Sequence, residues 1–413
     1  MRPVFDQSMT TASHLPLIGK SELITRAFRK QDLICLQHDL VRRLDQAPDD
    51  AHAMLDLSMV LLLNGQREQS LSMQGYALQA QQIYFMPARR QPVTLRLLVF
   101  VGPGDFMANT PLEFLIADSS IDLYLLYLGP GIPVPKSLPP HDVAMVAVGE
   151  NVGNRKLLQG LVEPLGRWHT PVLNLPARVL STSRDGLHAA LRGAPGIVSP
   201  ALARTDRLAL DELARGAANL QDILPEAQFP ILVRPVDSNA GENLEKIDAP
   251  AELSAYLGTS PGDDFFVSQF VDYRGPDGLY RKYRIVLIQG RAYLGHMGIS
   301  RRWMVHYLNA DMQESAANRA EEGAAMRNFD QEFGARHAQA FRTFHERVGL
   351  DYLIIDCGET PSGELLVFEA DTCGIVHDMD PEDLYPYKKS QMHKVFAAFQ
   401  AMLADCAARA TGA

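Results

Sequence analysis

A β-hairpin predicted between Asp351 and Gly374 constrains the fold of this chain most strongly. Two apolar runs, 352–355 and 365–368, have the length and composition of buried strands. The residues between them include Thr360-Pro361-Ser362-Gly363, in which proline and glycine favour a tight reversal of the chain. The stretch therefore predicts two antiparallel neighbours in one sheet.

Three carboxylates come together in this hairpin if its turn is centred between Ser362 and Gly363. Antiparallel counting then places Asp356 opposite Glu369, and Asp371 shares a face with Glu369 because side chains alternate along a strand. Like charges facing each other across strands are destabilising unless a cation lies between them. Mg²⁺ takes oxygen ligands and commonly bridges to phosphate. The hairpin thus predicts a metal site, with a solvated acidic edge as the alternative.

Composition and charge argue against several classes of function. The chain has 413 residues, of which 46% are hydrophobic and 21% charged, as in soluble globular proteins. Its 39 basic and 49 acidic residues give a net charge of −10, which argues against general nucleic-acid binding. No apolar run has the length of a membrane span, and no signal-peptide pattern is recognisable. The cysteines lack metal or redox spacing, so we expect a reduced, cytoplasmic protein; they are Cys35, Cys357, Cys373 and Cys406.

The first 92 residues are expected to form a helical region. Asp49-Asp50 can cap a helix that ends at Asn64-Gly65, and a second helix is expected from Arg67 to Tyr84. This pair is similar to one tetratricopeptide unit. A single repeat cannot bury its own apolar face, so it should pack on an upstream helix at 22–45 or on the main body. Protein docking and structural packing are both compatible with this pattern.

After a linker at 86–92, the pattern changes to alternating strands and helices. Four strands are expected, with a helix before the last one, which indicates a mostly parallel sheet; the strands are 94–101, 121–128, 143–148 and 171–173. The loop Gly102-Pro103-Gly104 can be interpreted as an anion site or as a plain strand-end turn.

A cation next to a loop of small residues predicts a phosphate site further along. The buried strand Phe229–Pro235 delivers Arg234 and leads into the loop 237–243. Backbone N–H groups and a fixed positive charge together suit phosphate.

The order of these motifs resembles the ATP-grasp superfamily, of the glutathione synthetase and RimK-like type. The resemblance covers residues 170–398 and rests on a helix with Arg184, the ILVRP strand and its loop, VSQFVD, YRIVLIQG, and the acidic hairpin. It implies an α/β (α+β) ATP-grasp fold with a preceding α/β domain and an N-terminal all-helical region. The implied domains are 1–92, 93–180 and 181–413.

The resemblance also implies site residues. Arg184 and Arg234 stand where the family has two phosphate-binding lysines, and arginine does not simply replace lysine. The nucleotide contacts would further include Ser238, Asn239, Gly241, the hinge residues Gln269, Phe270 and Val271, and Asp272 at the ribose. Arg284 matches the arginine that steadies the transferred phosphate. The metal ligands would be Asp356, Glu369 and Asp371, the last of which departs from the asparagine usual in the family.

Arg301 and Arg302 are candidates to clamp a substrate carboxylate, and Trp303, His306 and Tyr307 to shape an acceptor pocket. The alternative is a solvated basic turn above a packed aromatic ring. The implied reaction uses ATP and Mg²⁺: a carboxylate attacks the γ-phosphate, and an amine then attacks the acyl-phosphate and forms an amide. The expected partners are a small molecule or peptide with a carboxylate, an amine acceptor, a second copy of the chain, and a protein docked on the N-terminal helices.

Two other functions fit the same residues. The arginine replacements suit a nucleotide-binding scaffold or regulator with a degenerate site, whereas the acidic residues and Arg284 argue for catalysis. A kinase-like or ester-forming or thioester-forming enzyme would retain phosphoryl transfer without an amine. The helical segment 311–347 is compatible with a lid, a dimer surface or packing.

Overall fold

The computed structural model describes residues 15–236, 238 and 241–411 as a mixed α/β protein, which confirms the predicted fold class. The described chain forms two compact units. The first comprises the residues up to Leu180, together with 350–353 and the segment from Asp371 onward. The second comprises Ser181–Gly349 and Ile354–Ala370. Each unit is described by itself.

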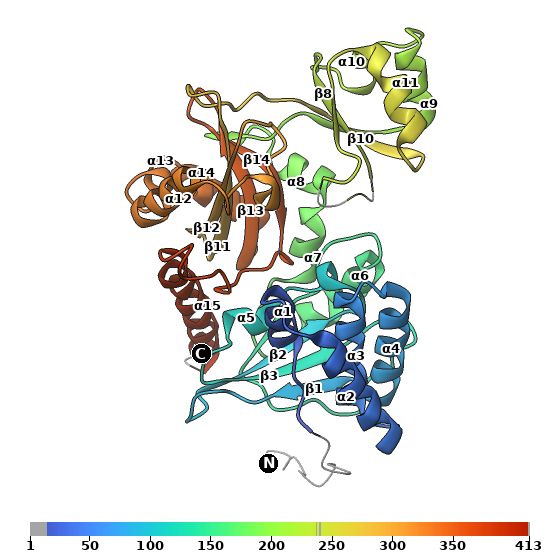
Figure 1. Ribbon diagram of the computed structural model, residues 1–413, viewed down its shortest axis with the longest axis vertical. Helices are drawn as coiled ribbons and strands as arrows, with labels where there is room; N and C mark the ends of the chain where they lie inside the picture. The colour runs from blue at the N-terminus through green and yellow to red at the C-terminus, as the bar shows by residue number, and fades with distance from the viewer. Residues whose placement is uncertain (1–14, 237, 239–240, 412–413) are drawn as a thin grey trace. The chain divides into compact units, whose positions relative to one another are not determined.

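Four helices begin the first unit (Figure 1). The expected single helix at 22–45 is wrong, because the chain breaks between α1 (Lys20–Phe28) and α2 (Leu33–Gln46). Asp32 starts the second of these by accepting the Ile34 N–H at 2.8 Å. The expected pair is present as α3 (Ala51–Leu63) and α4 (Arg67–Ala80), which pack against each other. Its identity as a tetratricopeptide unit stays a prediction.

A five-stranded sheet with the order β1-β3-β2-β4-β5 forms the rest of this unit. The strands β2 (Leu95–Val101), β3 (Ile121–Tyr127), β4 (Val143–Val146) and β5 (Val172–Leu173) run parallel. β1 (Ile83–Met86) pairs with β3 in the antiparallel sense, so the expectation of helix up to Tyr84 is wrong. The run Ile83-Tyr84-Phe85 suits a strand better than a helix, because branched and aromatic side chains pack well on a sheet. Further helices are α5 (Leu112–Leu115), α6 (Arg155–Gly166), α7 (Pro176–Val179) and α15 (Lys388–Thr411).

The Gly102-Pro103-Gly104 loop is a strand-end turn whose N–H groups are already bonded. The Gly102 N–H donates to the Asn109 side chain at 2.7 Å, and the Gly104 N–H donates to the Gln74 side chain at 2.8 Å. Of the two interpretations of this loop, the structure therefore favours the turn over the anion site.

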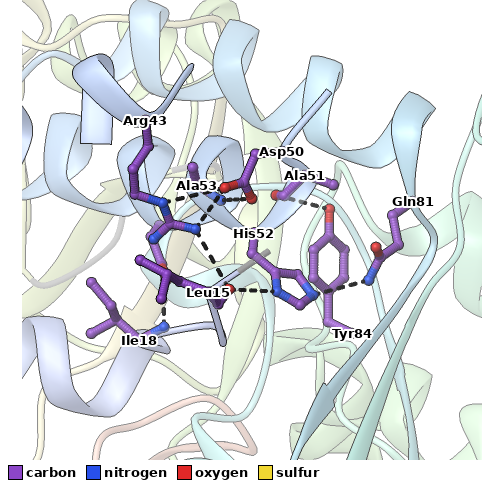
Figure 2. Close-up of polar contacts among 10 residues, drawn as sticks. Leu15, Ile18, Arg43, Asp50, Ala51, His52, Ala53, Gln81 and Tyr84 are labelled. Carbon is purple, nitrogen blue, oxygen red and sulfur yellow. Dashed lines mark hydrogen bonds and ion pairs between the residues drawn. The ribbon is translucent and has the colours of Figure 1, made fainter. Parts of the chain in front are cut away.

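A polar network joins the helices to the segment that precedes them (Figure 2). Arg43 Nη2 lies 2.7 Å from the Asp50 carboxylate, which also caps α3 through the Ala53 N–H at 2.9 Å. The His52 ring lies between the Leu15 carbonyl oxygen, at 3.2 Å from Nδ1, and the Gln81 side chain, at 3.3 Å from Nε2. These bonds thus tie the Leu15 segment, α2, α3 and the end of α4 to one another.

Two buried carboxylates hold the beginning of α1. Asp56 accepts the N–H groups of Ile18 and Gly19 at 2.8 and 3.1 Å, and Glu113 accepts the Ser21 N–H at 2.7 Å. Asp56 is only 2% exposed, and burial raises its pKa to about 7. Folding therefore favours the protonated form of Asp56 between its unfolded pKa of 3.8 and about pH 7.

The free energy of unfolding is expected to fall as the pH rises from 4 to 7. The folded state binds more protons than the unfolded state in this window, so deprotonation favours unfolding. We estimate this decrease in the free energy of unfolding at ~2–4 kcal/mol between pH 4 and 7. The Asp56→Asn variant, which has no titrating group at this position, should not show it. Urea titrations at several pH values measure it, with the exposed Asp45→Asn as the matched control. An unchanged slope in Asp56→Asn would contradict this role.

The second unit contains two sheets. One has the order β7-β10-β8-β9 and is antiparallel throughout: β7 (Leu202–Asp206), β8 (Ile231–Pro235), β9 (Glu245–Ile247) and β10 (Asp264–Gln269). Its apolar face packs against α9 (Arg207–Ala214), α10 (Leu220–Ile223) and α11 (Pro250–Thr259) around Phe265 and Leu253. β7 and β9 are short and were not expected from the sequence.

The other sheet has the order β12-β11-β13-β14-β6. Its strands are β6 (Ile197–Val198), β11 (Tyr280–Ile288), β12 (Arg291–Ser300), β13 (Tyr352–Glu359) and β14 (Leu365–Asp371). The helices of this part are α8 (Arg184–Leu191), α12 (Ala316–Asn328), α13 (Phe333–Arg336) and α14 (Ala338–Val348).

The predicted hairpin is β13–β14, but its turn is centred differently. The Gly363 N–H donates to the Thr360 carbonyl, and the Thr360 N–H donates to the Glu364 carbonyl. Gly363 has a φ of 83°, a left-handed conformation that adds one residue to the turn. The turn is thus centred on Ser362 rather than between Ser362 and Gly363, and the pairing of Asp356 with Glu369 stays a prediction.

Two findings concern the whole described chain. None of its described helices is long and apolar enough to cross a membrane. All four cysteines are free thiols, and Cys357 and Cys373 are buried.

Candidate functional site

Asp356 on β13 is the most deeply buried carboxylate of the predicted site, at 2% exposure. Arg284 on β11 binds it with two bonds, from Nε to Oδ1 at 2.8 Å and from Nη2 to Oδ2 at 2.9 Å. Lys282 Nζ lies 2.7 Å from the same Oδ2. Burial opposes ionisation, but Arg284 and then Lys282 outweigh it and hold the pKa of Asp356 well below its usual range. Asp356 is therefore an anion at neutral pH.

Glu369 on β14 is paired with Arg184, whose Nη2 lies 2.8 Å from Glu369 Oε2. Arg184 is the first residue of α8, and Ser183 caps that helix by accepting the Gly186 N–H. Partial burial opposes ionisation of Glu369, but the Arg184 guanidinium outweighs it and lowers the pKa of this carboxyl. The negative charge of Asp356 acts on Glu369 in the opposite sense, so the two predicted ligands lie within electrostatic range of each other.

Arg234 lies at the end of β8, as predicted, and is 7% exposed. Its Nε donates to the Ser238 hydroxyl at 3.0 Å, and its Nη2 donates to the Ser238 carbonyl. Burial, and to a smaller degree the positive charge of Arg184, lower the pKa of Arg234 to about 10, so it remains a cation at neutral pH. Asn239 lies outside the described residues. Gly241 approaches Met304, since a Cβ built on it would come within 3.3 Å of the Met304 sulfur.

The predicted cluster of three carboxylates is not found. The described residues contain no group of three His, Cys, Asp or Glu side chains that could hold a metal ion. Asp371 Oδ1 accepts the N–H groups of Cys373 and Gly374 at 2.5 and 2.6 Å, so this carboxylate stabilises the turn that follows β14. Among the described residues each of these carboxylates has its own donors, and their joint role as metal ligands stays a prediction.

The predicted hinge is only partly available to a ligand. The Gln269 N–H donates to the Ala201 carbonyl at 2.9 Å, and the Phe270 N–H donates to the Pro230 carbonyl at 3.3 Å. Val271 packs with Trp303 and Phe368 in a small apolar cluster. Asp272 is bound by the Arg274 guanidinium, at 2.5 Å from Nη2.

The predicted substrate residues lie in the loop that follows β12, and of these His306 is within electrostatic range of the site charges. Arg301 and Arg302 are exposed. The Trp303 ring meets the Phe270 ring edge to face at 5.8 Å. Burial lowers the pKa of His306, and the positive charges of Lys282 and Arg284 lower it further, whereas Asp356 and Glu369 act to raise it. His306 is therefore a neutral imidazole at pH 7, within range of both carboxylates.

Helix α12, which belongs to the segment 311–347, packs behind this loop. Glu322, fully buried, accepts the Tyr307 O–H at 3.2 Å and the Met297 N–H at 3.0 Å. Asn318 Nδ2 donates to the Ala310 carbonyl at 3.1 Å. The hydrogen bond to Glu322 thus fixes the Tyr307 side chain against α12.

Sequence reasoning missed Lys282. The signal was present, because Lys282 and Arg284 are two residues apart on one strand and must share a face. The motif drew attention to the arginine alone.

The side chains at this site suit a hard divalent cation and an anionic ligand together. Asp356 and Glu369 are ionised oxygen donors on neighbouring strands, which is the donor type that Mg²⁺ selects. Four cationic side chains surround these two carboxylates and leave two positive charges in excess; they are Arg184, Arg234, Lys282 and Arg284. Such an excess favours an anion such as a polyphosphate.

Comparisons with known proteins find similarity among solved structures only. No protein-family model matches the chain, and no match was found among curated proteins. A D-alanine–D-alanine ligase from Coxiella burnetii is 13% identical, with 77% of this chain and 97% of that chain covered and a TM-score of 0.45. A D-Ala:D-Ser ligase from Enterococcus faecalis is 15% identical, covers 74% and 98%, and has a TM-score of 0.43. A RimK-domain ATP-grasp protein from Sphaerobacter thermophilus is 17% identical, covers 76% and 99%, and has a TM-score of 0.41. Because these sequence identities and TM-scores are low, the function of this chain is inferred from its own site.

Proposed function

We propose that this chain is an ATP-dependent carboxylate–amine ligase of the ATP-grasp type, which forms an amide through an acyl-phosphate and releases ADP and phosphate. The observation that supports this most is the excess of cations around two ionised carboxylates, because phosphoryl transfer is catalysed by positioning and charge stabilisation.

The nucleotide would lie across the two sheets of the second unit. Arg184 and Arg234 would bind its phosphates, with Ser238 and Gly241 from the loop after β8 next to them. Of the three hinge residues, Val271 would meet the base with its backbone, because the N–H groups of Gln269 and Phe270 are bonded within the fold. Asp272 would reach the ribose only by releasing Arg274.

Arg284 would stabilise the negative charge that develops on the transferred phosphoryl group. Asp356 and Glu369 would hold Mg²⁺, with Asp371 as a third ligand if it released its backbone donors. When bound, the metal would neutralise phosphate charge and orient the oxygens for in-line transfer.

The two remaining substrates would meet at the loop after β12. Arg301 and Arg302 would bind a carboxylate, since exposed guanidinium groups suit its two oxygens. His306, neutral at pH 7, would accept the proton that the attacking amine loses. Tyr307, held by Glu322, would form a wall of the acceptor pocket. We further infer a RimK-like substrate class (an amino acid or peptide), with oligomerisation and protein docking on α1–α4 as secondary expectations.

A substrate screen tests this function. Pairs of amino acids or peptides are incubated with ATP and Mg²⁺, and both ADP and a new amide are measured by mass spectrometry. A ligase releases ADP only with the correct pair and forms an equal amount of amide. ADP with a phosphorylated or ester product would instead identify the kinase-like alternative.

A nucleotide-binding scaffold is the second candidate. It is favoured by Arg234, which is bound to Ser238 of its own loop rather than free to follow a moving phosphate. Saturable ATP binding with no turnover for any substrate pair would support this alternative.

A further inference from the structure

Lys282 is a cation that Asp356 does not need. The fork of Arg284 already satisfies both carboxylate oxygens with two bonds, which is the strongest geometry for such a pair. Lys282 adds a second positive charge at Oδ2, 2.7 Å away. A buried carboxylate needs one counter-ion, so the ammonium group is in excess there.

The Lys282 side chain is partly accessible to a ligand although its ammonium group is paired with Asp356. Its side chain is 18% exposed, whereas that of Asp356 is 2% exposed. The strand itself is fixed on the opposite face, where the Tyr283 ring stacks on Phe333 at 4.1 Å. The ammonium group acts electrostatically on Glu369 and on His306 as well, so it is placed among the groups of the candidate site rather than at its edge.

We propose that Lys282 is the lysine of the phosphate site, supplied by β11 where the expected positions 184 and 234 carry arginines. On nucleotide binding, its ammonium group turns from Asp356 to the terminal phosphates. A flexible stem and three rotatable donors suit lysine to this movement. The proposal rests on the proposed function only in requiring a nucleoside triphosphate as ligand.

The experiment measures nucleotide affinity by calorimetry, with Mg²⁺ and with EDTA. Lys282→Gln removes the charge but retains an N–H donor for Asp356, so it should fold. Lys282→Arg retains the charge. Lys389→Met is the matched control, because Lys389 forms an ion pair with Glu382 on the exposed surface of the first unit.

We expect Lys282→Gln to weaken ATP binding about tenfold or more in both buffers, since a charged hydrogen bond contributes roughly this factor. Adenosine binding should be unchanged, and Lys282→Arg should bind ATP within about threefold of the wild type. The Lys389→Met variant should match the wild type.

Three results would overturn the proposal: ATP affinity unchanged in Lys282→Gln, an equal loss for adenosine, or a loss confined to the Mg²⁺ buffer. The last would mean that Lys282 acts only through a metal carboxylate. ATP binding that depends on Lys282, without any ligase product, would contradict the proposed function and leave this inference standing.

Discussion

Replacing Arg284 with methionine is expected to lower the free energy of unfolding by about 3 kcal/mol, because breaking a buried ion pair from one side leaves its partner poorly compensated. Asp356 would retain Lys282 alone as its counter-ion. Because the folded-state pKa of Asp356 lies below its unfolded value of 3.8, the contribution of the pair is present above pH 4 and is lost as the pH falls through the folded pKa. Urea denaturation at pH 7 measures the difference.

A double-mutant cycle distinguishes the interaction between Arg284 and Asp356 from a general loss of stability. Asp356→Asn removes the negative charge with which Arg284 is paired. The double variant should therefore be more stable, by about 1 kcal/mol or more, than the sum of the two single effects predicts. Arg301→Met, an exposed arginine in the same unit, should lie within about 0.5 kcal/mol of the wild type. Additive effects in the cycle would show that the two side chains do not stabilise each other.

Glu369→Gln is expected to lower turnover strongly while the protein stays folded. The change preserves shape but removes the charge of a side chain that is 39% exposed, so little packing is lost. We expect ADP release with the correct substrate pair to fall by about 10²–10³-fold, the usual effect of removing one group that stabilises charge in the transition state. Initial rates by a coupled ADP assay measure it, with circular dichroism as the check on folding.

The matched control lies in the same hairpin. Glu364→Gln removes a carboxylate that accepts a bond from Ser362 on the exposed turn. It should leave the rate of ADP release unchanged. Equal losses in Glu364→Gln and Glu369→Gln would mean that the hairpin is damaged as a whole, and full activity in Glu369→Gln would remove this carboxylate from the site.

Strongly patterned segments were predictable from the sequence. The runs that became β2, β3, β8 and β13 are mostly apolar and have glycine or proline nearby, which indicates buried strands there. The last helix and the α3–α4 pair were expected for the same reason, since their apolar residues recur at helical spacing. Pairing between distant strands brings Arg284 to Asp356, and both had been assigned to the site.

Short elements and side-chain pairing were not predictable. β1 pairs with β3 along an edge, and its four residues carry too little pattern to outweigh the helix before them. The centre of the hairpin turn depends on the left-handed conformation of Gly363, which the strand pattern does not reveal. Asp371 is turned to its own following backbone, a local bond that strand alternation cannot anticipate.

The most direct test of a nucleotide site at Asp356 and Glu369 is a calorimetric titration of the wild-type protein with ATP, with Mg²⁺ and with EDTA. The site described here predicts saturable binding of one ATP per chain, tighter with Mg²⁺, and a loss of the Mg²⁺ effect in Glu369→Gln. Absence of saturable binding up to about 1 mM ATP, the upper end of usual substrate affinities, would contradict it.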